Sequence, residues 1–280
     1  MNKSVLITGI NGFLGRHLLN ALTAKDYRVA GLCRTDTSLI PENPGVKLYT
    51  NAEALFRQEP GFEYIFHLAS FIPYGKFHEP HAEFYTTNIK LTGLIDEHYA
   101  SSKFVFASSV AVYGVPLQLP LQVNSPFNRP DYYGLSKIAG EAIVKNHANH
   151  AIIRFSSIIG KGMKPVTLIP KMIEQVKQTK AIQVWGTGER MQNYIDVRDA
   201  ARLCMQCADY SENIITLGVA EKSYTNNQAA QLIALNTGAI IEYTGEDASP
   251  SFTYDPSPEY KTLHFKPAIT FERTIAEMKV

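Results

Sequence analysis

Three regularly spaced glycines directly after a short apolar run constrain the fold of this chain more than any other feature. Residues 3–8 have the pattern of a buried strand, Gly9, Gly12 and Gly15 follow in the spacing G-x-x-G-x-x-G, and residues 13–24 show helical periodicity. Glycines let the backbone turn tightly and approach a pyrophosphate, which the N–H groups and dipole at a helix N-terminus attract. An ordinary strand-to-helix turn is the alternative, but a strand before and a helix after favour nucleotide binding. We assign that role to the turn residues Gly9, Asn11, Gly12, Phe13, Leu14 and Gly15.

Further apolar strands alternate with helical patterns through the first half of the chain. Strands are predicted at residues 27–33, 46–49, 64–68, 103–108 and 151–155, and helices at residues 52–58, 79–100 and 133–146. Such alternation indicates an α/β protein with a doubly wound parallel Rossmann sheet, in which ligands bind beyond the carboxyl ends of the strands. Gly15, Arg34 and Ser109 are predicted to lie at such ends.

The regular alternation ends after Phe155. Two glycine-rich breaks, at residues 160–162 and 186–188, flank one predicted helix at residues 168–178. We therefore expect an NAD(P)-binding Rossmann domain at residues 1–155, with residues 190–217 returning to it. Residues 156–280 are expected to form mainly a smaller C-terminal substrate-binding lobe.

Composition narrows the class of partner. The net charge of the 280 residues is +1 with no run of like charges, so we expect no nucleic-acid or membrane partner but a small molecule. The first ten residues lack the apolar stretch of a signal peptide, and three cysteines do not form a disulfide framework, so we expect a cytoplasmic protein. Cys204 and Cys207 are predicted to be buried helix residues. No metal is predicted, because the closely spaced histidine pairs lack accompanying ligands.

Tyr133 and Lys137 lie four residues apart at the start of a predicted helix, so their side chains share one face. A lysine ammonium and a bound nicotinamide cation would both favour the phenolate and lower the pKa of Tyr133. Such a tyrosine can exchange a proton with a sugar or alcohol oxygen. A solvated helix face is the alternative, because this spacing also arises by chance.

Cofactor choice rests on the end of the second predicted strand, Cys33-Arg34. An acidic residue there would hold the ribose hydroxyls of NAD, whereas an arginine suits the 2′-phosphate of NADP. The sequence therefore favours NADP over NAD, with Arg34 as the contact. Leu68 ends another predicted strand, Ala69 and Ser70 follow it, and all three are predicted to line the cofactor.

The assembled motifs resemble the extended short-chain dehydrogenase/reductase family, in particular the NAD-dependent epimerase/dehydratase group that modifies nucleotide sugars. The resemblance covers essentially the whole chain and rests on the glycine triplet, His67-Leu68-Ala69-Ser70, Asn88, Ser108-Ser109-Val110-Ala111-Val112-Tyr113-Gly114, Tyr133-x-x-x-Lys137, Arg154 and Gly160, with Asp199 as a later match. It implies that Ser109 binds the substrate oxygen, that Tyr133 is the acid/base, and that Lys137 holds the cofactor ribose. It also implies a homodimer built from two long helical segments.

Departures from the family pattern refine the predicted chemistry. Val110-Ala111 stand where dehydratases carry Asp-Glu, so dehydration is not expected. The family's substrate-gripping R-D-F segment appears here as Gln192-Asn193-Tyr194, so Lys161, Arg190 and Gln192 become the candidate substrate-binding residues.

The favoured hypothesis is an NADPH-dependent reductase of a 4-keto group on a nucleotide-activated sugar. A 4-epimerase with tightly bound NAD is the alternative. A nucleotide-sensing regulator without chemistry is a second alternative, which the catalytic residues Ser109, Tyr133 and Lys137 argue against.

Overall fold

A seven-stranded parallel sheet forms the centre of the computed structural model, which describes residues 3–25, 27–34, 38–40 and 43–278. The strand order is β10-β6-β5-β4-β1-β2-β3, and every neighbouring pair runs parallel. The strands are β1 Ser4–Thr8, β2 Arg28–Leu32, β3 Val46–Tyr49, β4 Tyr64–His67, β5 Lys103–Ser109, β6 His150–Phe155 and β10 Ile214–Gly218. The chain reverses direction along the sheet between β1 and β4, which confirms the predicted doubly wound Rossmann topology.

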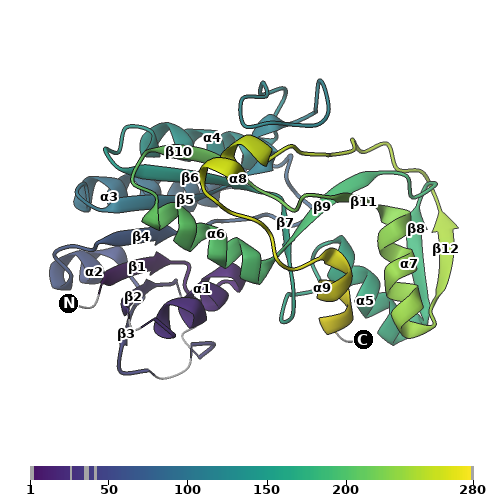
Figure 1. The fold of residues 1–280 in the computed structure, drawn as a ribbon, viewed down its shortest axis with the longest axis horizontal. Coiled ribbons are helices and arrows are strands. Elements are labelled where there is room, and N and C mark those ends of the chain that lie inside the picture. The colour runs from purple at the N-terminus through teal and green to yellow at the C-terminus, as the bar shows by residue number, and fades with distance from the viewer. Residues whose placement is uncertain (1–2, 26, 35–37, 41–42, 279–280) are drawn as a thin grey trace.

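Helices cover both faces of this sheet, because successive residues of each buried strand point to opposite sides. Val5 and Ile7 pack in one core with α1 (Phe13–Thr23) and α6 (Val197–Asp209), whereas Leu6 packs in the other with α2 (Ala52–Gln58), α3 (Leu91–His98) and α4 (Tyr132–Val144). Figure 1 shows α1 and α6 on one side of the sheet and α3 and α4 on the other. The apolar runs are therefore continuous because both sides are buried.

A smaller lobe, on the right in Figure 1, has its own apolar core. It contains a three-stranded sheet of order β11-β9-β7 and a two-stranded parallel sheet of β12 and β8. Its elements are β7 Ser157–Ile159, α5 Leu168–Thr179, β8 Ala181–Trp185, β9 Met191–Asp196, β11 Ser223–Thr225, α7 Asn226–Thr237, β12 Ile240–Thr244 and α9 Phe271–Glu277.

Segments late in the chain return to the large lobe. β10 completes the large sheet and α6 packs in the core of that lobe, whereas β9 pairs with β7 and β11 in the smaller sheet, with Ile195 reaching the large core. The helix α8 (Ser257–Thr262) also returns, because Tyr260 is buried in the large core and its O–H donates to Val219 O at 2.7 Å. The two lobes therefore interdigitate in sequence, and within the segment 190–217 that was predicted to return, β10 lies in the large sheet and β9 in the smaller one.

The structure replaces the single helix predicted at residues 79–100 with two consecutive helices of different type. The first is a π-helix, η1 (Phe84–Lys90), the second is α3, and the Leu91 N–H bonds to Thr86 O, five residues earlier. A π-turn adds one residue to a helical turn and so changes which side chains face inward. Here it accompanies the inward placement of Asn88, which is 1% exposed.

Within the described ranges, none of the helices combines the length and the apolar character that crossing a membrane requires.

Candidate active site

Tyr133 and Lys137 lie one turn apart in the first half of α4, and both are buried. The helix starts here because Asp131 caps it, accepting the Gly134 N–H at 2.7 Å. Lys137 Nζ donates to Ala107 O on β5 at 2.8 Å and lies 5.9 Å from the centre of the Tyr133 ring. α4 therefore holds both side chains at the carboxyl end of β5.

The predicted lowering of the Tyr133 pKa is wrong for the protein by itself. Burial raises the pKa of Tyr133 to about 12, although the hydroxyls of Ser70 and Ser109 beside the phenol oppose the shift. Burial also lowers the pKa of Lys137 to about 7, against the opposing charge of Glu141. Desolvation disfavours the charged form of each group, and a lysine whose pKa is lowered in this way stabilises a phenolate less than a permanently charged one. The argument from spacing left out this cost of burial.

Ser109 ends β5 and caps the short 3₁₀ helix η2 (Val110–Tyr113), where its Oγ accepts the Ala111 N–H at 3.2 Å. The residue is half-buried, and its hydroxyl lies beside the Tyr133 phenol. A serine, a tyrosine and a lysine thus gather at one strand end. Such a cluster can bind an alcohol or carbonyl oxygen and exchange a proton with it.

The glycine turn brings β1 and α1 close together. Gly9 has a φ of +70° and donates its N–H to Leu32 O at 2.7 Å, which connects the turn to the end of β2. A Cβ at Gly15 would lie 2.3 Å from Gly9 O, so only glycine permits this approach. Asn11, Phe13 and Leu14 complete the turn and the first turn of α1.

Arg34 follows the end of β2 directly after the buried Cys33, and its side chain is exposed. The Gly9–Leu32 hydrogen bond places this strand end beside the glycine turn. The residues that the structure describes offer Arg34 no ion-pair partner. The arginine is therefore positioned as the sequence predicted, although its role as a cofactor contact stays a prediction.

Leu68, Ala69 and Ser70 form a half-buried loop after β4. Ala69 N–H donates to Thr8 Oγ1 at 3.1 Å, which links this loop to the residue before the glycine turn. Asn88 holds the far side of the loop, since its Oδ1 accepts the Phe71 N–H at 2.7 Å. The loop thus lies between β1 and η1 with its backbone fixed at both ends.

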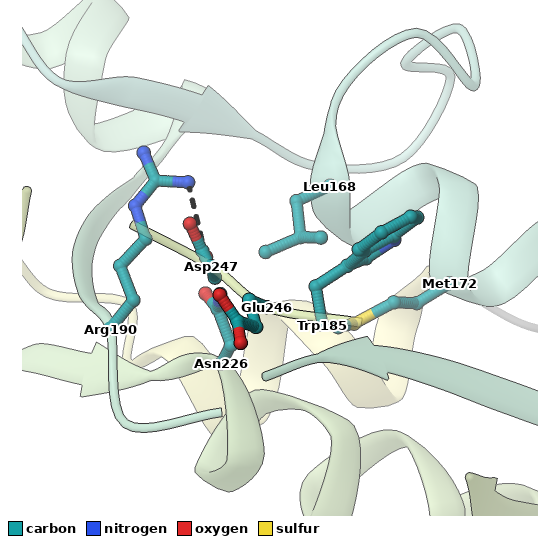
Figure 2. Close-up of a pocket in the computed structure, with 7 residues that line it drawn as sticks. All are labelled: Leu168, Met172, Trp185, Arg190, Asn226, Glu246 and Asp247. Carbon is teal, nitrogen blue, oxygen red and sulfur yellow. Dashed lines mark ion pairs between the residues drawn. The ribbon is translucent and has the colours of Figure 1, made fainter. Parts of the chain in front are cut away.

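The predicted substrate-binding residues are spread over both lobes. Lys161 is exposed between β7 and α5. Arg190 and Gln192 lie at the start of β9, where the guanidinium of Arg190 faces Asp247 at 3.8 Å and Gln192 Nε2 donates to Asn226 Oδ1 at 2.8 Å. Figure 2 shows Arg190 and Asn226 on the wall of a cavity in the small lobe. Among the described contacts, none joins these residues to Ser109.

Comparison with known proteins gives the family. The profile of the NAD dependent epimerase/dehydratase family matches residues 5–218. This chain belongs to that family. As a member of these extended short-chain dehydrogenases/reductases, it is an NAD(P)-dependent enzyme.

Relatives within the epimerase/dehydratase family differ in activity. A putative UDP-glucose 4-epimerase of Methanocaldococcus jannaschii is 28% identical over 243 residues, 79% of this chain and 79% of that protein. A dTDP-4-dehydro-6-deoxy-D-allose reductase of a Streptomyces species is 24% identical over 237 residues, 73% of this chain and 72% of that protein. The solved structure of MoeE5 in complex with UDP-glucuronic acid and NAD shares the fold, with a TM-score of 0.87 at 20% identity over 98% of this chain and 97% of that one.

The residues of this epimerase/dehydratase family member fit a bound dinucleotide. Gly12 caps α1 without a side-chain hydrogen bond, and the first turn of that helix carries no acidic residue. Arg16 Nε is buried without a hydrogen-bond partner in the described part of the chain. A helix N-terminus whose N–H groups have no side-chain cap and a guanidinium N–H without a partner are together suited to binding phosphate oxygens.

Sequence reasoning missed Arg16 and Thr92, and it named His67 and Asn88 only as residues that carry the family resemblance, without a role. His67 is 0% exposed, with its ring nitrogens 2.8 Å from Thr8 Oγ1 and 2.9 Å from Thr92 Oγ1. Thr92 in turn donates to Asn88 O at 2.9 Å, and burial lowers the pKa of His67 to about 3, so the ring is neutral. A polar chain therefore runs from the glycine turn to Asn88. Apart from the match of His67 and Asn88 to the family pattern, its sequence signal is polar residues at positions where an apolar pattern expects a core.

Proposed function

We propose that the enzyme reduces a 4-keto group on a nucleotide-activated sugar with NADPH as reductant. The observation that carries this proposal is the exposed Arg34 beside the glycine turn, where a residue that selects NAD would be acidic. Arginine binds phosphate through paired N–H donors, which suits the 2′-phosphate of NADP. NADPH is the usual reductant when reduction is net.

When bound, NADPH would supply the hydride to C4. Tyr133 is well suited to supply the accompanying proton to O4, because a phenol with a pKa of about 12 is protonated at neutral pH. After the transfer, the Ser70 and Ser109 hydroxyls beside it stabilise the phenolate that forms. Ser109 also orients the substrate oxygen, and Lys137 holds the cofactor ribose. The phenol is therefore in the protonated form that the acid role in reduction requires.

A second candidate is 4-epimerisation with NAD held through the cycle. The similarity to the putative UDP-glucose 4-epimerase of Methanocaldococcus jannaschii favours it. The same three side chains would serve both reactions, since an epimerase first removes and then returns the hydride. The two candidates differ in net cofactor consumption.

The discriminating assay offers a nucleotide-linked 4-keto sugar with NADPH and, separately, the matching 4-hydroxy sugar without added reductant. Stoichiometric loss of NADPH absorbance supports the reductase. Formation of the C4 epimer without net cofactor change would replace it with the epimerase.

Arg34→Ala tests the cofactor assignment. A charge-assisted contact is worth about 1.5 to 3 kcal/mol, so NADPH affinity should fall about tenfold to a hundredfold while NADH affinity stays nearly constant. Arg57→Ala, at an exposed position on α2, serves as the control. Equal losses for the two dinucleotides would contradict the role of Arg34.

We further propose a homodimer through the helices η1, α3 and α4, which pack together on one face of the sheet. Large apolar side chains remain exposed on these helices: Tyr85 at 61%, Leu94 at 38% and Leu135 at 49%. Burial of such residues between two copies would remove apolar surface from water. Light scattering of a micromolar solution should give a dimer mass, and a monomer mass would refute the interface.

A further inference from the structure

The small lobe contains a cavity of about 220 Å³ with one apolar and one polar wall. Leu168, Met172 and Trp185 form the apolar wall, from α5 and the end of β8. The polar wall combines the turn before β9, the start of α7 and the segment after β12, through Arg190, Asn226, Glu246 and Asp247. Figure 2 shows Leu168 and Trp185 facing these polar side chains across the cavity.

Trp185 provides a flat surface for a planar ligand. It is 57% exposed, although its six-membered ring packs against Gly245, where a Cβ would lie 2.6 Å from the ring. Trp185 pairs with Thr244 across β8 and β12, so the backbone beneath the ring is held by a sheet. The indole of Trp185 is exposed on one side and supported by Gly245 and the β8–β12 pair on the other. Together with the neighbouring Leu168 and Met172, it suits stacking of an aromatic base.

The polar wall carries more negative than positive charge. Two carboxylates, Glu246 and Asp247, stand against the single guanidinium of Arg190. Asp247 already accepts the Ser249 N–H at 2.9 Å and faces Arg190 at 3.8 Å. Arg190 Nε donates to Pro250 O at 3.2 Å, which leaves further N–H groups of the guanidinium as donors. Glu246 has no hydrogen-bond or ion-pair partner among the described residues. Such a wall repels a diphosphate but offers both acceptors and donors to a neutral base.

We propose that this cavity binds the guanine base of a guanosine-diphosphate-linked sugar, an inference that rests on the proposed function. The edge of guanine presents one acceptor, O6, next to two donors, N1–H and N2–H₂. Arginine commonly donates to O6 and N7 of guanine, and a carboxylate can accept from both donor groups. Arg190 and Glu246 supply these two partners.

Other bases match the wall less well. Uracil and thymine carry a second acceptor, O2, where guanine has its amino group, and this oxygen would face a carboxylate. Adenine lacks the N1–H donor. The charge of Glu246 therefore both attracts guanine and discriminates against uracil and thymine, which is how a binding site acquires specificity.

Trp185 makes binding directly measurable, because it is the only tryptophan in the chain. GDP, UDP, dTDP and ADP would be titrated separately into the full-length protein without dinucleotide, with tryptophan fluorescence as the readout. Stacking on the indole should quench the emission, and GDP should bind about tenfold to a hundredfold more tightly than the other three. An equal or stronger response to UDP, dTDP or ADP would overturn the base assignment, and so would the absence of quenching by every nucleotide.

Glu246→Gln identifies the residue that reads the base. Its GDP affinity should fall about tenfold toward the UDP affinity, whereas Glu242→Gln, an exposed β12 position outside the cavity, should leave the ranking unchanged. A Glu246→Gln protein that retains the full GDP preference would remove this residue from the proposal.

The measurement involves no turnover, so its outcome is independent of hydride transfer. GDP selection without reduction of a GDP-linked 4-keto sugar would refute only the proposed function, and reduction with a UDP preference would refute only the guanine site.

Discussion

The two lobes hold an arginine against a carboxylate in opposite ways. In the large lobe, Arg154 donates to both oxygens of Glu141, at 2.9 and 2.8 Å, and the two side chains are 4% and 1% exposed. In the small lobe, Arg190 and Asp247 lie 3.8 Å apart with 27% and 14% of their side chains exposed. The first pair is bidentate and buried, whereas the second is a longer contact that is partly exposed to solvent.

This difference agrees with the two roles that we propose, proton transfer in the large lobe and ligand selection in the small lobe. Arg154 also donates to Val123 O at 2.7 Å, and Glu141 accepts the Ser108 hydroxyl at 2.6 Å, so one buried pair joins β5, β6, α4 and the loop that contains Val123. Proton transfer requires such fixed positions. The small lobe instead leaves charged and aromatic groups accessible, which suits the selection of a ligand. Positioning depends on buried groups, and specificity depends on exposed ones.

The largest effect is expected on breaking the buried pair. Glu141→Gln would leave the charged Arg154 buried beside a neutral amide that has one acceptor oxygen in place of two. Loss of one member of a buried ion pair typically costs about 3 to 5 kcal/mol of folding stability. Urea unfolding should show this loss, whereas Glu97→Gln, on the exposed face of α3, should not. A loss below about 1 kcal/mol would mean that water enters the large lobe far more than its burial indicates.

The next effect concerns chemistry rather than stability. Tyr133→Phe keeps the ring packing and removes only the hydroxyl, so turnover should fall about a hundredfold or more while NADPH affinity stays nearly constant. Tyr132→Phe is the matched control on the exposed side of the same helix, since Tyr132 is 46% exposed. Unchanged turnover in Tyr133→Phe would assign proton transfer to another group.

A pH-dependent effect on stability is expected from Lys137. Burial lowers the pKa of Lys137 from 10.5 to about 7, so the unfolded chain binds the proton more tightly than the folded chain. The cost of burying the charge is fully present below pH 7 and disappears as the pH rises toward 10.5. Each pKa unit corresponds to about 1.4 kcal/mol, and the lost hydrogen bond to Ala107 offsets part of the gain.

Lys137→Met should therefore be more stable than the unmodified protein by about 1 to 3 kcal/mol at pH 6.5, with a smaller difference at pH 10. Thermal unfolding of both proteins across this range measures the trend. Lys145→Met, whose side chain is 44% exposed, should show no comparable trend. A difference that does not vary with pH would mean that Lys137 stays charged in the folded protein.

The smallest effect is expected in the small lobe. Arg190→Gln removes a partly exposed pair, so the free energy of unfolding should change by less than about 1 kcal/mol. Comparison with Glu141→Gln in the same urea titration gives the ratio between the lobes. If Arg190→Gln lowers the free energy of unfolding as much as Glu141→Gln does, the two ion pairs do not differ in the way that their burial indicates.

Local patterns in the sequence were sufficient for the central part of the fold. Continuous apolar runs separated by helical periodicity predicted the parallel sheet, because strands buried on both faces need apolar residues throughout. The glycine triplet predicted the turn between β1 and α1, and the spacing of Tyr133 and Lys137 predicted their shared face. Each of these depends on residues close together along the chain. The small-lobe strands β8, β11 and β12 bury at most two residues each and so lack a continuous apolar run, and they were not predicted. The strands β7, β9 and β10 were not predicted either.

Tertiary structure alone decided the properties that depend on burial and on distant partners. The spacing of Tyr133 and Lys137 predicted a lowered tyrosine pKa, but desolvation raises the pKa of Tyr133 to about 12 and lowers the pKa of Lys137 to about 7. In the sequence, Asp199 stands out only as a match to the family pattern, whereas in the structure it is 0% exposed and accepts the N–H groups of Ala268 and Ile269. The pKa of a group depends on how much water remains around it, and a hydrogen bond between residues 69 positions apart depends on the path of the whole chain. Neither can be obtained from neighbouring residues in the sequence, because both arise only when distant segments pack together.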